Sequence, residues 1–178
     1  MGIGFSKPEE QQVAKSLAVG DTAPPLPDVH STNKKMIGFL RHSGCPFAEA
    51  TVKSMRNWAT LYPDIDFIAV THGDAQITKN WLAKIGGTAG IIHIHSSDRE
   101  LHGQWGIGFS DRNHFTGLAT LAAVFSLLFK GIHNREDTGT RWQRSATFFV
   151  DGSGRVVWHH HAKIAHELPT IESAMSRA

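Results

Sequence analysis

Short apolar runs alternate along the chain with longer stretches in which apolar residues recur at helical spacing. Three of the runs predict buried strands, at residues 35–40 (KMIGFL), 66–71 (DFIAVT) and 91–95 (IIHIH). Apolar residues recur every three or four positions from about residue 48 to 62, and a second helical stretch covers about 75–85. The first part of the chain is therefore predicted to alternate between strands and helices.

The clearest signal in the second part of the chain is a β-hairpin. Apolar runs at 145–150 and 155–160 flank the sequence DGSG at 151–154, which is a strong turn signal. A short helix is predicted before the hairpin at 97–105, and a last helix after it at 165–176.

Two regions carry less regular patterns. Residues 106–141 read as an insertion that contains a strongly apolar helix at 117–129. Such a helix is buried on all sides or buries one face in a partner. We interpret it as a core element with a homodimer contact, with a lid over an apolar pocket near Cys45 or a reversible membrane contact as alternatives. Residues 1–34 are predicted to be irregular, apart from a short helix at 9–17.

Strands that alternate with helices favour an α/β fold built around a mostly parallel sheet. The closing hairpin and last helix favour a thioredoxin-like three-layer fold, in which a central mixed sheet is flanked by helices. The apolar helical insertion comes before the final hairpin. We expect residues 1–178 to form one such domain, with 1–18 as an N-terminal extension.

Composition narrows the class of partner. Eighteen Lys and Arg against 16 Asp and Glu give a net charge of only +2, and no basic stripe is visible, so a nucleic-acid partner is not expected. The apolar run at 117–129 is shorter than the roughly 20 residues that a membrane-spanning helix needs. No apolar leader follows the first residues, and the chain has a single Cys, so we expect a cytoplasmic protein without disulfides or stable membrane insertion.

The single cysteine, Cys45, stands where a strand is predicted to end and a helix to begin. Pro46 occupies a natural first helical position. A helix N-terminus carries partial positive charge and free N–H groups, which stabilise a thiolate, the nucleophilic form of cysteine. Arg41 and His42 lie just upstream and add positive charge. The alternative is an inert cysteine of the core.

Four segments carry a resemblance to a known family. They are FLRHSGCPFA at 39–48, VGDTAP at 19–24, SDREL at 97–101 followed by WGI at 105–107, and WQRSATFFVD at 142–151. In this order and spacing they resemble the peroxiredoxin-like branch of the AhpC/TSA group, within the thioredoxin superfamily. The resemblance covers roughly residues 19–175.

The resemblance implies a set of site residues for a peroxidase reaction. Cys45 would attack the peroxide, while Arg144 and Arg41 would stabilise its thiolate and the developing negative charge. His42 would hold the thiolate or donate a proton to the leaving group. The pocket would be completed by Ser43, Gly44, Pro46, Phe47 and Trp142. No cofactor and no metal are implied.

Three departures from the family pattern change the expected chemistry. Ala48 stands where the motif has a second cysteine, so an external thiol such as glutathione or thioredoxin, or Cys45 of a second subunit, would have to reduce oxidised Cys45. His42 replaces the hydroxyl residue that would orient peroxide, which leaves Ser43 as a substitute. Arg144 is close to the place of the family's arginine, with a shift of one residue left open.

Two other classes of function remain open. One is a degenerate thioredoxin-fold protein that binds or transforms an apolar small molecule in the pocket beside Cys45, with no peroxidase activity. The other is a non-catalytic dimerisation or scaffold module. Two pairs of histidines, 93 with 95 and 159 with 161, have the spacing that places both side chains on one face of a strand, where they could bind a metal ion together. Histidines on an exposed strand surface are the simpler interpretation of this pattern.

Overall fold

A computed structural model describes residues 6–9, 11–110, 126–129, 131–163, 167 and 169–176. Its strands are β1 (Lys34–Phe39), β2 (Ile65–Thr71), β3 (Ile92–His95), β4 (Ala146–Val150) and β5 (Val156–His161). Its helices are α1 (Pro46–Leu61), α2 (Ala75–Lys84), α3 (Glu100–Gln104) and α6 (Ile171–Met175). The five strands and the helix that follows Cys45 are formed where the sequence pattern predicts them.

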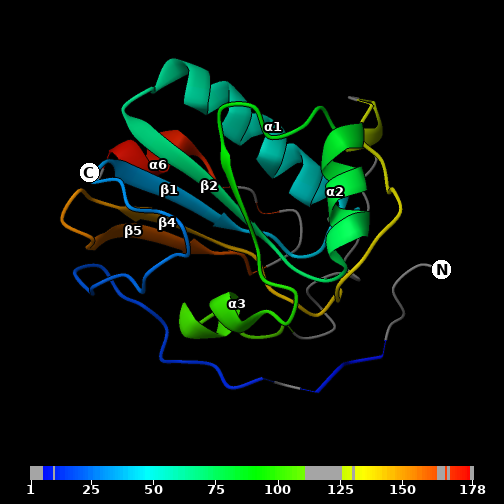
Figure 1. The fold of residues 1–178 in the computed structure, drawn as a ribbon, viewed down its shortest axis with the longest axis horizontal. Helices are drawn as coiled ribbons and strands as arrows, with labels where there is room; N and C mark the ends of the chain where they lie inside the picture. The colour runs from blue at the N-terminus through cyan, green and yellow to red at the C-terminus, as the bar shows by residue number, and fades with distance from the viewer. Residues whose placement is uncertain are drawn as a thin grey trace.

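The five strands form one mixed sheet in the order β3-β2-β1-β4-β5 (Figure 1). β1 and β3 run parallel to β2, whereas β4 runs antiparallel to both β1 and β5. The parallel half is connected through α1 and α2, as crossover connections require. The predicted α/β architecture with a mixed sheet is therefore confirmed.

Helices cover both faces of the sheet. Successive strand residues point to opposite faces, so Met36 and Phe149 pack on the side of α1, α2 and α6, while Ile37 and Phe148 pack on the other side. That second face is covered by the α3 region and by apolar residues that precede β1. Figure 1 shows α1 and α3 on opposite sides of the strands. The result is the expected three-layer arrangement.

The N-terminal helix predicted at 9–17 is not formed in the described part of that stretch. Residues 11–18 run in irregular conformation beside α3, where the backbone N–H of Ala14 donates to the carbonyl oxygen of Gly103 at 2.9 Å. Gln11 adds a side-chain hydrogen bond to the carbonyl oxygen of Arg99. These tertiary hydrogen bonds replace the internal ones that a helix would have made.

The last helix is shorter than the prediction of 165–176. Helix α6 begins only at Ile171, and Thr170 caps it by accepting a hydrogen bond from the backbone N–H of Ser173. Residues 167, 169 and 170 are not helical. The residue before a proline is disfavoured in helical conformation, and Pro169 therefore separates the cap from what precedes it.

The apolar helix predicted at 117–129 lies largely outside the described residues. Only its last part, 126–128, is described as helical, and Phe129 directly after it is 92% exposed. Among the helices that the structure describes, none has the length and apolar character needed to cross a bilayer.

Candidate active site

Cys45 lies at the N-terminus of α1, at the carboxyl edge of the parallel strands. β1 ends at Phe39, and residues 40–45 form the connection to the helix. A turn closes this connection, with the backbone N–H of Cys45 donating to the carbonyl oxygen of His42 at 3.4 Å. Cys45 has extended backbone angles, caps the helix and is followed by Pro46 at the first helical position. The thiol therefore faces the positive end of a helix of 16 residues.

A segment from the second half of the chain lies over this connection, and we call residues 135–141 the covering segment. The backbone N–H of Arg135 donates to the carbonyl oxygen of Gly44 at 3.1 Å, and that of Thr138 donates to Ser43 at 3.3 Å. Gly44 has a φ of 88°, and a Cβ there would lie 2.7 Å from the carbonyl oxygen of Glu136. Only glycine fits both the backbone angle and the close approach.

Arg41 provides the positive charge at the thiol. Its side chain is buried, and Nη1 lies 4.0 Å from the Cys45 Sγ. Nη2 donates to the carbonyl oxygen of Arg141 at 3.1 Å, which holds the guanidinium in place. Nε is buried and has no hydrogen-bond partner among the described residues. One donor of the guanidinium therefore has no acceptor within the described residues.

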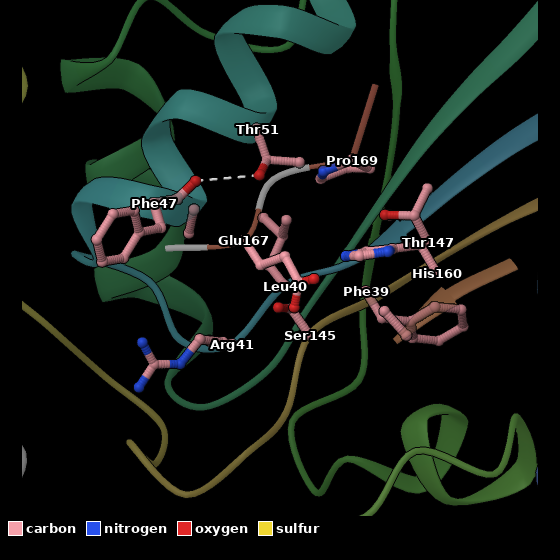
Figure 2. A pocket seen from close by; sticks show the side chains of 13 residues that line it. Phe39, Leu40, Arg41, Phe47, Thr51, Ser145, Thr147, His160, Glu167 and Pro169 are labelled. Atoms are coloured by element: carbon pink, nitrogen blue, oxygen red, sulfur yellow. Dashed lines mark hydrogen bonds between the residues drawn. The ribbon is translucent and has the colours of Figure 1, made fainter. Parts of the chain in front are cut away.

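A narrow pocket adjoins this pair between β1, α1, β4 and the end of β5 (Figure 2). Arg41, Phe47, Ala48 and Ser145 line the pocket, whereas Cys45 itself is not among its lining residues. The volume open to the centre of a water-sized sphere is about 20 Å³. About 10–15 Å³ by this measure is enough for one water molecule, so the pocket suits a very small ligand.

The far wall of the pocket is polar. His160 Nε2 is buried with no hydrogen-bond partner among the described residues. Burial lowers the pKa of His160, although the Glu167 carboxylate opposes the shift. The Thr51 hydroxyl donates to the carbonyl oxygen of Phe47 at 3.0 Å, the dashed line in Figure 2. A neutral imidazole and a carboxylate thus face the pocket opposite Arg41.

Arg144 faces the other side of the sheet. Its Nη2 lies 3.4 Å from the carbonyl oxygen of Phe109, and its charge acts on His161, whose ring packs on Phe148 in the α3-side core. The neighbouring Ser145 lines the pocket instead. Adjacent residues of an extended segment point to opposite faces, so a shift of one residue separates Arg144 from the thiol. Within the described residues it has no contact with Cys45.

His42 is buried beside the thiol connection, and its Nδ1 has no hydrogen-bond partner among the described residues. Burial holds the pKa of His42 well below its usual range, and the charges of Arg41 and Arg141 lower it further. His42 is therefore neutral at pH 7. A neutral imidazole is a poor proton donor, which argues against the general-acid role and leaves a packing role.

The Ser43 hydroxyl is engaged elsewhere. It lies 3.0 Å from the hydroxyl of Thr78 in α2, and both side chains are buried. Its contact ties the thiol connection to α2 rather than directing a hydroxyl at the sulfur. Trp142 also lies outside the set that lines the pocket, with its carbonyl oxygen accepting hydrogen bonds from Ser110 and its ring 5.9 Å from Lys7 Nζ.

The molecule resembles several solved structures in its fold. A peroxiredoxin-like protein from Aquifex aeolicus aligns at a TM-score of 0.62 and 14% identity over 94% of this chain and 89% of that one. A thiol peroxidase from Chromobacterium violaceum aligns at 0.60 and 11% identity over the same shares. Mycobacterium tuberculosis AhpC aligns at 0.53 and 14% identity over 90% and 95%.

The fold resembles that of these peroxiredoxin-like and thiol peroxidase structures. At such low identity the likeness is one of architecture. No family model matches the sequence, and no curated protein matches it. The expected thioredoxin-like fold class is confirmed, whereas the roles of individual site residues depend on the geometry above.

One charged residue of the site was missed by the sequence reasoning. Glu49, one turn into α1, is completely buried and forms ion pairs with Lys53 at 2.6 Å and Arg135 at 2.9 Å. Burial by itself raises the pKa of a carboxyl group, but the hydrogen bonds from Arg135 and Lys53 outweigh it and lower the pKa of Glu49. The sequence indicated only that Glu49 lies at helical spacing from apolar residues, which could have suggested its burial but not its partner Arg135.

The paired histidines do not form a metal centre in the part of the chain that the structure describes. His93 Nε2 and His95 Nδ1 both lie within hydrogen-bond distance of the Thr71 hydroxyl, at 2.7 and 3.1 Å. The rings of His159 and His161 have centroids 5.4 Å apart and pack near Phe148. Both pairs are accounted for by local hydrogen bonds and ring contacts.

Proposed function

We propose that the protein is a thiol peroxidase in which Cys45 reduces small hydroperoxides. The observation that carries this proposal is the buried guanidinium of Arg41, with Nη1 at 4.0 Å from the sulfur and Nε without a partner among the described residues. A cation and a helix N-terminus favour the thiolate, and the free donor suits an oxygen in contact with the sulfur. The fold shared with peroxiredoxin-like proteins supports the same chemistry in coarse terms.

The first step is a displacement at oxygen. The Cys45 thiolate attacks the hydroxyl oxygen of the hydroperoxide, so that an S–O bond forms and the O–O bond breaks. The sulfur becomes a sulfenic acid, and the departing oxygen takes a proton to leave as an alcohol or as water. Arg41 stabilises the negative charge that develops on the departing oxygen.

The second stage needs an external thiol, because the sequence contains no other cysteine. One thiol condenses with the sulfenic acid, releasing water and forming a mixed disulfide, and a second thiol displaces Cys45 as the free thiol. Glutathione or thioredoxin in a reducing cytoplasm is the proposed source. The low exposure of Cys45, 3%, means that the covering segment must move before a bulky thiol can attack.

The proposed peroxide is small. The pocket that Arg41 lines has room for little more than one water molecule, and Cys45 beside Arg41 is buried, so we propose hydrogen peroxide rather than a lipid hydroperoxide. A homodimer is also proposed, because the strongly apolar sequence at 117–129 suits a helix that buries one face in a partner.

The deciding experiment is a titration with hydrogen peroxide followed by intact mass. One equivalent is expected to add one oxygen to the protein, and Cys45→Ser is expected to add none. Glutathione or reduced thioredoxin should then restore the original mass. A Cys45 that reacts with iodoacetamide but takes up no oxygen would contradict the proposal.

A second candidate is a small-molecule binding protein on the same fold. The observation that favours it is the Ser43–Thr78 contact, which engages the hydroxyl that the sequence offered for orienting a peroxide. Binding would then occur in the pocket beside Arg41 without oxidation of Cys45. Ligand binding that persists in Cys45→Ser, together with no oxygen uptake by the native protein, would favour this candidate.

A further inference from the structure

The connection between β1 and Cys45 contains two buried carbonyl groups that the sheet does not satisfy. β1 ends at Phe39, although the backbone N–H of Leu40 still donates to the carbonyl oxygen of Val70 at 2.9 Å. The carbonyl oxygens of Leu40 and Arg41 lie beyond the ladder and need other donors, since an unpaired buried carbonyl costs free energy.

Two histidine side chains supply those donors. His102 Nε2 lies 3.1 Å from the carbonyl oxygen of Leu40, and His72 Nε2 contacts that of Arg41. A carbonyl oxygen only accepts, so each imidazole must carry its proton on Nε2. His72 directly follows β2, and His102 belongs to α3. Two separate elements therefore hold two consecutive carbonyl groups.

The two histidines form one buried cluster. Both side chains are buried, and their rings meet edge to face with centroids 5.3 Å apart. His102 also packs edge to face on Phe39, at 5.2 Å, which places the cluster on the α3 side of the sheet. Gly139 of the covering segment closes over His72, because a Cβ there would collide with the ring.

Both rings are held in the neutral form. Burial lowers the pKa of His72 to about 4 and holds that of His102 well below its usual range. The charge of Arg99 opposes protonation of each, and so does the neighbouring imidazole, His95 for His72 and His72 for His102. Each ring thus stays a neutral donor with a constant tautomer over the pH range in which thiols react.

We propose that His72 and His102 are positioning residues of the thiol site. By holding the backbone of residues 40 and 41, they place the Arg41 guanidinium against the Cys45 sulfur. This inference rests on the proposed function, in which that contact activates the thiol. Neither histidine lines the pocket, and neither forms a hydrogen bond with the sulfur among the described residues, so both act through the backbone of residues 40 and 41.

The test measures the rate of Cys45 alkylation by iodoacetamide across a pH series, which does not require peroxidase activity. His72→Leu removes the donor and is expected to slow alkylation about fivefold at neutral pH, the ratio that one ordinary hydrogen bond corresponds to. His72→Gln keeps an N–H donor at similar reach and is expected to react nearly as fast as the native protein. His102→Leu and His102→Gln should behave in the same way.

A double-mutant cycle with Arg41→Gln separates positioning from a general structural role. If His72 acts through Arg41, His72→Leu has almost no further effect in the Arg41→Gln background. Multiplicative effects, or a His72→Gln variant as slow as His72→Leu, would overturn the inference. If His72→Leu fails to fold, the cycle is run with His72→Gln and His72→Asn, whose amide nitrogens reach different distances.

The control is His93→Leu, which removes a histidine bonded to Thr71 at the sheet edge. It is expected to leave alkylation unchanged. Oxygen uptake from hydrogen peroxide by the native protein is measured separately, so failure of the peroxidase proposal and failure of the positioning proposal give different results.

Discussion

Glu49 and Arg135 form a two-point ion pair that joins the first turn of α1 to the covering segment. Arg135 Nε donates to one carboxylate oxygen at 2.9 Å, and Nη2 donates to the other at 3.3 Å. The same arginine uses its backbone N–H to hold Gly44 beside Cys45. The ion pair therefore anchors the covering segment to the first turn of α1, next to the connection that carries the thiol.

Arg135→Ala is predicted to destabilise the protein by about 2 kcal/mol, because the buried Glu49 carboxylate keeps only Lys53 as a partner. It is also predicted to speed alkylation of Cys45 by bulky maleimides. Urea unfolding and alkylation kinetics check the two effects.

The matched control is Lys84→Ala, whose 3.8 Å contact with Glu136 joins two exposed side chains. It should lower the free energy of unfolding by less than about 0.5 kcal/mol. Equal stability losses in the two variants would refute the role of the buried pair.

Arg41→Gln is predicted to slow both alkylation and peroxide oxidation of Cys45 about tenfold at neutral pH, because it removes the cation at the sulfur. Arg144→Gln is predicted to leave both rates unchanged, since Arg144 contacts Phe109 on the other side of the sheet. Stopped-flow kinetics of the two variants provide the comparison. If Cys45 reacted slowly in Arg144→Gln but at the native rate in Arg41→Gln, Arg144 rather than Arg41 would be the cation that activates the thiol.

Stability is predicted to fall as the pH drops below about 6.5. The pKa values of His42, His72 and His102 are lowered in the folded protein, so the unfolded chain takes up protons first. Each histidine then contributes a loss of about 1.4 kcal/mol per pH unit, which for His72 continues until the pH reaches about 4. Urea unfolding at pH 7, 6 and 5 measures the slope.

His72→Gln removes one of these titrating groups. The free energy of unfolding should therefore depend less steeply on pH, by the contribution of one histidine. His30→Gln serves as the control, because His30 lies in the irregular region before β1. An unchanged slope in His72→Gln would show that His72 is not held neutral in the folded protein.

Local patterns explain why much of the fold could be predicted from the sequence. The runs that became β1 and β2 are apolar on both faces, as strands buried between two helical layers must be. Pro46 begins α1 because its missing N–H and restricted φ suit the first helical position. The errors fell at residues 9–17 and at the start of the last helix, where packing against α3 and the break at Pro169 outweighed helical propensity.

The side chains around the thiol were less predictable. Arg41 and Arg144 both looked suitable, but the extended segment before β4 turns Ser145 to the pocket and Arg144 away from it. The sequence suggested that the Ser43 hydroxyl could orient a substrate, but it forms a hydrogen bond with the Thr78 hydroxyl of α2. Glu49 gave no sign of its buried ion pair, because its partner Arg135 comes from a distant part of the chain.

The sequence by itself determined that a lone cysteine caps a helix at the end of a strand, since strand pattern, turn and proline are all local features of residues 35–62. Only the tertiary structure decided which cation, which hydroxyl and which histidines meet there. Those choices depend on the register of β4 against β1 and on the path of the covering segment. Both follow from packing between distant segments, which no local pattern encodes.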